Sequence, residues 1–264
     1  MKEEATCTNT LVTLFEKGRI SQEETSIITE FPLQITVNGQ RLVNLLCTPR
    51  HLKELVIGFL FTEGLIFSLE DIIEVKIGGG KADVRIRREM GDRGGGMVPW
   101  IMTGCGQNVV WPDRGDRDCI FNIRIESRLA LPAAVISSRI HQMQRVSALY
   151  QKTRGVHGAA LADAQDLIIF REDIGRHNAV DKVVGSALCS GVTIDDKLLL
   201  TTGRISSEIL VKAARLKVPF IVSRSVPTDY AVWLGRALGI TIVGFVRGDR
   251  LKVYTHDWRV LGNI

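Results

Sequence analysis

The residue best suited to chemistry in this 264-residue chain is Cys105, which lies between Gly104 and Gly106. The turn-rich runs GDRGGG and WPDRGDRD stand on either side of it and predict a loop on which the thiol is accessible. Nearby cations lower the pKa of a thiol from about 8.5 and so favour the nucleophilic thiolate. We therefore predict a catalytic role for Cys105; an incidental exposed cysteine is the alternative. The arginines that flank the loop are Arg85, Arg87, Arg88, Arg93, Arg114 and Arg117.

The other cysteines do not suggest a disulfide framework. The chain has five cysteines at irregular spacings, and an odd number suits a reducing, cytoplasmic setting. Cys47, Cys119 and Cys189 lie in strand or helix patterns, which predicts small buried apolar side chains, whereas Cys7 lies in a polar amino-terminal stretch. No CxxC pair or Cys/His cluster has zinc-ligand spacing, so we expect no metal site and no tightly bound zinc.

A second candidate site is the charged stretch REDIGRHNAVDK, residues 171–182, which follows an apolar strand pattern and opens a helix. Arg176 and His177 near the exposed amides of a helix start would bind an anion. An ion-pair network that joins the strand to the helix explains the same residues equally well. Asp181 lies four residues after His177, so it could orient the imidazole ring.

Three further loops have the same position between a strand and the next element. In TTGRISSE, residues 201–208, Arg204 could hold a phosphate, whereas Ser206 is explained by ordinary helix capping. SRSVPTDY, residues 223–230, repeats this arrangement. GFVRGDR, residues 244–250, taken alone reads as a surface hairpin turn. Because such loops meet at one edge of a sheet, the sequence predicts one shared ligand crevice there.

His157, in GVHGAALAD, raises the possibility of a zinc-dependent deaminase. That chemistry needs His-x-Glu and a later pair of cysteines. Here Gly158 and Ala159 follow the histidine, and SRSVPTDY has no cysteine pair. The sequence therefore predicts that His157 is a buried or ligand-contacting residue, and it argues against hydrolytic deamination.

The pattern of elements predicts an α/β protein in two units. Residues 1–30 are polar and weakly patterned, which indicates a loose lead-in. Residues 31–128 predict a small β-grasp-like ββαββ domain, with a hairpin at Asn38-Gly39, a helix between Thr48 and Gly64, and the Cys105 loop. CIFNIRI, residues 119–125, reads as a further strand. Residues 129–264 begin with a long helix after Pro132 and then alternate strands and helices, which predicts a sheet covered on both faces.

Composition excludes some classes of function. The 34 basic and 29 acidic residues give a net charge of +5, which fits an anionic ligand but is too weak to indicate nucleic acid. No run approaches the ~18 apolar residues of a membrane span, and the amino terminus lacks the apolar core of a signal peptide. We expect a cytoplasmic protein that binds neither nucleic acid nor membrane.

Several stretches together resemble the FdhD/NarQ family of formate dehydrogenase accessory proteins. REDIGRHNAVDK is long enough to make a chance match improbable. The matching segments are GFLFTEGLI (58–66), GVHGAAL (155–161), REDIGRHNAVDKVVG (171–185), TTGRISSEILVKAAR (201–215), SRSVPT (223–228) and TIVGFVRGDRLKVYT (241–255).

The resemblance implies a homodimeric sulfur carrier with a cytidine-deaminase-like three-layer carboxyl-terminal domain. Such a protein accepts sulfur from a cysteine desulfurase as a cysteine persulfide, here on Cys105. It passes the sulfur to the molybdenum or tungsten bis-guanine-dinucleotide cofactor before that cofactor enters formate dehydrogenase. Residues 176, 177 and 204 would share the cofactor with the family's contact near the last strands. That contact maps to Phe245, Val246, Arg247, Gly248, Asp249 and Arg250.

The chain departs from the family pattern at one position. The family loop commonly reads Cys-x-x-Cys-Gly, and here Cys105 is followed at the second cysteine position by Asn108. One thiolate suffices to carry a sulfane sulfur, so a single-cysteine carrier is chemically adequate. The missing thiol also favours an alternative, a chaperone that binds the cofactor or the apoenzyme without sulfur transfer.

Overall fold

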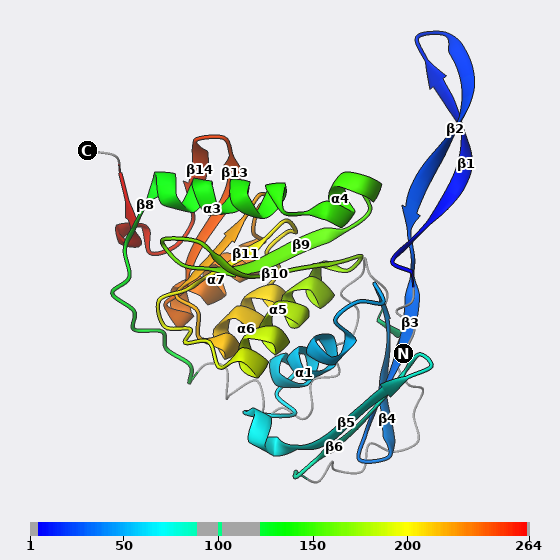
Figure 1. The fold of residues 1–264 in the computed structure, drawn as a ribbon. Coiled ribbons are helices and arrows are strands. Elements are labelled where there is room, and N and C mark those ends of the chain that lie inside the picture. Colours follow the sequence, from blue (N-terminus) through cyan, green and yellow to red (C-terminus); the bar gives the residue numbers. More distant parts are fainter. Residues whose placement is uncertain (1–4, 89–99, 102–121, 263–264) are drawn as a thin grey trace.

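The structure is a computed structural model of the 264-residue chain that describes residues 5–88, 100–101 and 122–262. It contains a projecting hairpin, a five-stranded sheet with one helix, and a six-stranded sheet with helices on both faces (Figure 1). The mixed α/β class predicted from the sequence is confirmed. The domain boundaries at residues 30/31 and 128/129, and the comparison with cytidine deaminase, stay predictions.

The first thirty residues do not form a loose lead-in, and that prediction was wrong. Strand β1 (Cys7–Glu16) pairs with β2 (Arg19–Ile28) as an antiparallel hairpin in unbroken register. We call residues 7–28 the arm. It extends away from the body of the molecule (Figure 1), so its side chains have few neighbours that would produce a readable burial pattern in the sequence.

The five-stranded sheet has the order β5-β6-β3-β4-β7, and its first four strands and helix follow the predicted ββαββ sequence. Asn38 and Gly39 both have positive φ, which confirms the predicted hairpin turn. One face of this sheet packs against helix α1 through a core of aliphatic side chains. The elements are β3 (Phe31–Val37), β4 (Gln40–Cys47), α1 (Leu52–Thr62), η1 (Leu69–Asp71), β5 (Ile72–Gly78), β6 (Lys81–Ile86) and β7 (Trp100–Ile101).

Helix α1 begins later than the sequence predicts. Its N-cap is His51, in the left-handed conformation, because Thr48 is drawn into a buried hydrogen-bond network instead of capping the helix. The predicted end is confirmed. Gly64 has a φ of +75°, and the amide of Leu65 donates to the carbonyl of Leu60 at 2.9 Å.

The six-stranded sheet has the order β10-β9-β11-β12-β13-β14, and its three strands β11, β12 and β13 are parallel. Leu198 and Leu200 pack toward helix α3, whereas Leu199 packs toward α5, α6 and α7, so helices cover both faces. The strands are β9 (His157–Ala162), β10 (Leu167–Asp173), β11 (Leu198–Thr201), β12 (Phe220–Ser223), β13 (Thr241–Arg247) and β14 (Arg250–Val253). The helices are α3 (Ala133–Arg145), α4 (Ala148–Thr153), α5 (Arg176–Ser190), α6 (Ser207–Leu216) and α7 (Asp229–Leu238).

Two details of this half differ from the predictions. The long helix after Pro132 is two helices, α3 and α4, separated at Val146–Ser147. The strand expected at 119–125 is absent from its described part, residues 122–125, although Ile125 is buried. Short strands β8 (Leu131–Pro132) and β15 (Val260–Leu261) pair in parallel, and η2 (Asp257–Arg259) precedes the latter.

Helices α1 and α5 join the two sheets at an unusually close crossing. A Cβ atom on Gly58 would lie 1.8 Å from the carbonyl oxygen of Asp181, and one on Gly185 would lie 1.9 Å from that of Glu54. Only glycine allows backbones to approach this closely. The crossing therefore fixes how the five-stranded sheet sits on the six-stranded one.

Candidate functional site

A cavity of about 960 Å³ opens where the parallel strands β11, β12 and β13 end. It lies between the loops after these strands and the helices α3 and α4. Four arginines and two histidines line it, and none of the described residues that line it is acidic. They are His141, Arg145, Arg154, His157, Arg224 and Arg247. A concave site with unbalanced positive charge concentrates anions.

The loops at the strand ends hold one another in place. The hydroxyl of Ser223 donates to the carbonyl of Gly203 at 2.6 Å, and the amide of Ser225 donates to the hydroxyl of Ser223 at 2.9 Å. Arg224 stands between these two serines. Its Nε atom is buried and has no hydrogen-bond partner among the described residues. A buried donor without a partner is costly, so this arginine is suited to an anionic ligand.

Arg247 reaches the cavity from a distorted part of β13. The register with β14 shifts between Gly244 and Arg247, and Phe245 adopts a φ of +56°. The amide of Phe245 donates to the carbonyl of Ser225 at 2.7 Å, and this bond connects the bulge to the loop that contains Arg224. The Arg247 guanidinium lies 4.6 Å from the centre of the Phe245 ring. Bulges and strained residues of this kind occur beside functional sites, where they redirect a side chain.

His157 belongs to the cavity wall. Its Nδ1 atom lies 3.1 Å from the hydroxyl of Thr202, which also accepts from the amide of Gly158. Burial is the main cause that lowers the pKa of His157, and the charges of Arg176 and His177 lower it further. His157 is half-buried, and its contact with a ligand stays a prediction.

The wall formed by α4 is fixed by Glu172. Its carboxylate accepts hydrogen bonds from the hydroxyl of Ser147 at 2.9 Å and from the amides of Leu149 and Tyr150 at 3.1 and 3.0 Å. These are the free amides at the start of the helix, so the bonds resemble a cap supplied from a neighbouring strand. Arg154, at the other end of α4, lies 5.1 Å from the centre of the Tyr150 ring.

The comparisons with known proteins place the chain in a family. Residues 28–261 match the model of the FdhD/NarQ family. The chain belongs to the FdhD/NarQ family. It is 41% identical over 253 residues to a sulfur carrier protein FdhD of Listeria innocua, covering 93% of this chain and 95% of that one. It is 39% identical over 254 residues to the sulfur carrier protein FdhD of Bacillus subtilis, and the match covers 93% of this chain and 94% of that one.

A solved structure agrees with this assignment. The crystal structure of a putative formate dehydrogenase accessory protein from Desulfotalea psychrophila superimposes with a TM-score of 0.79 at 27% identity. The match covers 97% of this chain and 100% of the other. The resemblance that the sequence motifs indicated is confirmed, and the arrangement of sheets and helices is that of an FdhD/NarQ protein.

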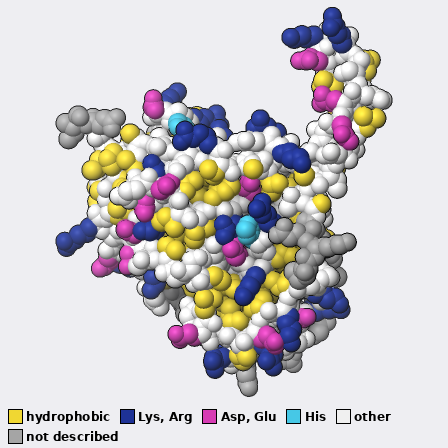
Figure 2. All heavy atoms as spheres, in the orientation of Figure 1, with side chains coloured by type: hydrophobic (Ala, Val, Ile, Leu, Met, Phe, Trp, Pro, Cys, Tyr) yellow, Lys and Arg dark blue, Asp and Glu magenta, His cyan; other side chains and the backbone are white. Residues whose placement is uncertain are grey.

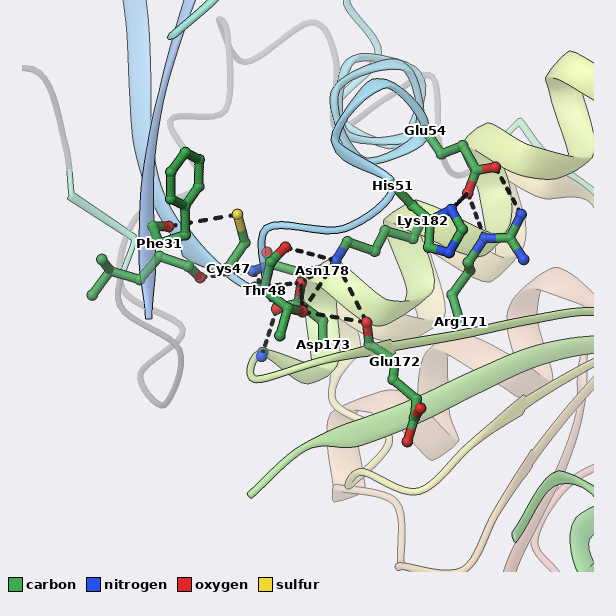
Figure 3. A network of polar contacts seen from close by, with 12 residues as sticks. Phe31, Cys47, Thr48, His51, Glu54, Arg171, Glu172, Asp173, Asn178 and Lys182 are labelled. Carbon is green, nitrogen blue, oxygen red and sulfur yellow. Dashed lines mark hydrogen bonds and ion pairs between the residues drawn. The ribbon is translucent and has the colours of Figure 1, made fainter. Parts of the chain in front are cut away.

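Several charged residues of the FdhD/NarQ stretch 171–182 build the joint between the sheets (Figure 3). Lys182 is fully buried, and its Nζ lies 2.6 Å from a carboxylate oxygen of Asp173. The same oxygen accepts from the amide and hydroxyl of Thr48 at 3.1 and 2.9 Å. Arg171 pairs with Glu54 of α1 at 2.7 Å. The ion-pair alternative therefore describes this part of the motif.

A second buried cluster joins α1, α5 and α6. Asp181 does not orient His177 as predicted, because its carboxylate accepts from Lys212 at 2.9 Å and from Thr62 at 2.7 Å. His177 instead places Nε2 3.0 Å from a carboxylate oxygen of Glu208. This bond is the main cause that lowers the pKa of Glu208.

The predicted ligand residues separate into two groups. Within the turn at 245–250, Arg247 lines the cavity, whereas Val246 is buried in the core and residues 248–250 are exposed. Arg176, His177 and Arg204 lie at the starts of α5 and α6 and do not line the cavity. The side chain of Arg176 covers Gly203, where an added Cβ would lie 2.9 Å from it. The contact of these three residues with a ligand stays a prediction.

The cysteines differ in burial and in whether the structure describes them. Cys47 is buried as predicted, and desolvation is the main cause that raises its pKa to about 12, so it is no nucleophile. Cys189 is exposed, so its predicted burial was wrong. Cys105 and Cys119 lie outside the described residues. Among the described residues, no three His, Cys, Asp or Glu side chains cluster as metal ligands would, and no helix is long and apolar enough to cross a bilayer.

Sequence reasoning missed several cavity residues. His141, Arg145 and Arg154 belong to the helical stretch after Pro132, where they read as ordinary polar helix residues. Arg224 lies inside the singled-out loop SRSVPTDY but was not among the predicted site residues. The sequence contained one signal for the cavity, the convergence of loops at one edge of the sheet. This signal predicts where a ligand binds but not which helices face that edge.

Proposed function

We propose that this protein carries sulfur on Cys105 and delivers it to the molybdenum or tungsten bis-guanine-dinucleotide cofactor used by formate dehydrogenase. The relatives named sulfur carrier protein FdhD, at about 40% identity over most of the chain, support the carrier role. The observation that carries the proposal for the acceptor is the basic cavity. Its arginines have the charge and hydrogen-bond donors that bind phosphate groups.

The cavity residues fit a polyanionic substrate of this kind. The two guanine dinucleotides contribute pyrophosphate groups, and guanidinium groups bind phosphate oxygens through two parallel N–H donors. Arg224 and Arg247 come from adjacent loops, whereas Arg145 and Arg154 come from the opposite wall. Phosphates between the two walls would therefore be held from both sides. Arg176, His177, Arg204 and the 245–250 turn are proposed as an extension of this surface.

The loading step on Cys105 is a thiol exchange. The thiolate of Cys105 attacks the sulfane sulfur of the persulfide on a cysteine desulfurase. A new S–S bond forms on Cys105, the S–S bond of the desulfurase breaks, and the desulfurase cysteine leaves as a thiolate. No oxidant is consumed, because one persulfide replaces another. Asn108 supplies no second thiol, so the persulfide is resolved by the acceptor and not within the loop.

The loading step is tested with a cysteine desulfurase and ³⁵S-cysteine. We expect label on the wild-type protein that is released by a reducing agent, and no label on Cys105→Ala. Cys189→Ala is the matched control, because Cys189 is an exposed cysteine outside the proposed chemistry. Equal labelling of wild type and Cys105→Ala would contradict the assignment of Cys105.

A cofactor-holding chaperone is the second candidate, and Asn108 at the position of the second family cysteine favours it. This protein would bind the dinucleotide cofactor in the basic cavity but take up no sulfur. The labelling experiment separates the two, since neither the wild type nor any variant of a chaperone would carry label. Nucleotide binding in the cavity would persist in both cases.

A further inference from the structure

Glu172 connects the joint between the sheets to the wall of the basic cavity without itself lining the cavity. Its main-chain carbonyl oxygen lies 3.4 Å from Nζ of the buried Lys182, so the main chain here belongs to the joint. Its side chain points away from the joint (Figure 3). Glu172 pairs with Gly158 of β9, so no opposing side chain competes for the space beside the carboxylate. A carboxylate on a fixed strand therefore reaches α4.

The helix α4 depends on this carboxylate for its position. It has six residues, and a helix this short is not stable on its own in water. The hydroxyl of its N-cap residue, Ser147, donates to Glu172 instead of capping the helix, and Leu149 is the one residue of α4 that is buried. Oε1 of Glu172 accepts from the amide of Tyr150, and Oε2 accepts from that of Leu149. The cap of α4 is therefore supplied by β10.

The position of α4 in turn sets the position of Arg154. Arg154 is the C-cap of α4 and adopts a φ of +55°. It is exposed, and Figure 2 shows Lys and Arg side chains at the surface over α4. Its guanidinium lies over the ring of Tyr150, the residue whose amide Glu172 holds. A ring contacts the face of a guanidinium and leaves the N–H donors at its edge for phosphate oxygens.

We propose that Glu172 is a positioning residue for anion binding in the cavity. It holds α4 so that Arg154 meets the phosphate groups from the wall opposite Arg224. This role rests on the proposed function, in which the cavity binds the phosphate groups of a dinucleotide. Because Glu172 acts through Arg154, its loss weakens binding without removing a donor from the cavity.

The sign of the effect separates positioning from charge. A carboxylate near a basic cavity repels an anion, so a purely electrostatic role predicts that anions bind more tightly once the charge of Glu172 is removed. A positioning role predicts the opposite, because an arginine that is no longer held in place loses part of its contact with the ligand.

Calorimetric titration of two Glu172 variants with GDP tests this sign. Glu172→Ala removes all three bonds to Ser147, Leu149 and Tyr150, whereas Glu172→Gln keeps the Oε1 acceptor. Both variants remove the same charge. We expect Glu172→Ala to bind GDP about tenfold more weakly than the wild type, and Glu172→Gln to lie between the two. Unchanged or tighter binding by Glu172→Ala would overturn the proposal.

Glu54→Ala is the matched control for a general loosening of the fold. Glu54 pairs with Arg171, the residue before Glu172, and so holds the joint on the other side of β10 from α4. This variant should bind GDP as the wild type does. An equal loss of affinity in Glu54→Ala and Glu172→Ala would show that disturbing β10 anywhere weakens binding, which would contradict a specific role for Glu172.

A double-mutant cycle tests the route through Arg154. In an Arg154→Ala background, Glu172→Ala should weaken GDP binding by less than about threefold, because the arginine that it positions is gone. In an Arg224→Ala background the loss should stay near about tenfold, because Arg224 lies on the opposite wall. A full loss in the Arg154→Ala background would show that Glu172 does not act through Arg154.

Hydrogen–deuterium exchange tests the position of α4 without any ligand. We expect the amides of α4, residues 148–153, to exchange faster in Glu172→Ala than in the wild type, and those of α3, residues 133–145, to exchange equally. A wild-type protein that does not bind GDP would contradict the proposed function, and the exchange rates would still decide whether Glu172 holds α4. Equal exchange of α4 in both proteins would overturn the role of Glu172.

Discussion

The basic cavity and the buried joint between the sheets are both rich in charge, but they differ in how that charge is balanced. In the joint, Lys182 and Lys212 lie 2.6 and 2.9 Å from the carboxylates of Asp173 and Asp181. In the cavity, four arginines line the wall, and no carboxylate does among the residues that the structure describes. Burying a charge is costly unless a partner compensates it, so a paired cluster maintains the fold. An unbalanced cluster is arranged for a partner from outside.

The comparison also explains why a charged motif is a poor guide to a ligand site. The stretch 171–182 has the densest charge of the FdhD/NarQ motifs, yet Asp173 and Lys182 neutralise each other inside the molecule. Arg224 stands in a less conspicuous loop. Its buried Nε has no hydrogen-bond partner in the described structure, which is also true of Arg139 and Arg215, but of these three only Arg224 lines the cavity. Whether the charges of a cluster are balanced, more than how many there are, therefore distinguishes a ligand site from a structural ion-pair cluster in this protein.

The largest effect is expected from breaking the joint. Lys182→Met leaves Asp173 buried without its cation, and loss of one partner from a buried pair costs about 3–5 kcal/mol of the free energy of unfolding. Urea denaturation measures the loss. Lys53→Met, which removes an exposed lysine from α1, is the control and should change stability by less than about 0.5 kcal/mol. Equal stability of the two variants would show that the ion pair does not stabilise the joint.

A smaller effect is expected at the helix crossing. Gly58→Ala would place its Cβ 1.8 Å from the carbonyl oxygen of Asp181, so α1 must move away from α5. Overpacking of this kind costs about 3 kcal/mol. Gly78→Ala is the matched control, because nothing lies within 4 Å of the added atom. Thermal unfolding compares the two, and a Gly58→Ala protein as stable as Gly78→Ala would disprove the close crossing.

The smallest effect concerns the charge state of the cavity. Burial, Arg176 and His177 lower the pKa of His157 in the folded state, whereas in the unfolded chain it stays near 6.5. The unfolded chain then binds the proton more readily, so stability is lost as the pH falls from about 6.5 toward the folded-state pKa.

His157→Asn should therefore lose less stability than the wild type between pH 7 and pH 5, as measured by denaturation at each pH. The pKa of His51 is also lowered, but His51 is present in both proteins, so the difference isolates His157. An NMR titration should show His157 protonating below the range of a free histidine. A signal that titrates above 6.5 would contradict the environment described for it.

Local signals predicted much of the fold. The turn at Asn38-Gly39, the cap at Ser206, the helix end at Gly64 and the alternation of strands and helices each depend on nearby residues, and the structure contains them. The failures involve distant contacts. Thr48 does not cap α1, because Asp173 lies 125 positions away in the chain but adjacent in space.

Of the cavity, the sequence predicted only the edge of the sheet at which it lies. Arg224 and Arg247 lie in loops that the sequence singled out. Arg145 ends α3, and Arg154 follows α4, whose start is fixed by Glu172, so both face the cavity only through the packing of distant segments. The arm escaped prediction for the opposite reason. Its apolar side chains are not buried within the described chain, so no core-facing pattern marked β1 and β2 as strands.

Calorimetric titration with GDP tests most directly the claim that the unbalanced arginines form the ligand site. We expect Arg224→Ala to weaken binding at least tenfold, about 1.4 kcal/mol, through the loss of a charged hydrogen-bond donor. Arg236→Ala, which removes an exposed arginine on α7, should bind GDP as the wild type does. Identical affinities for wild type, Arg224→Ala and Arg236→Ala would contradict the account.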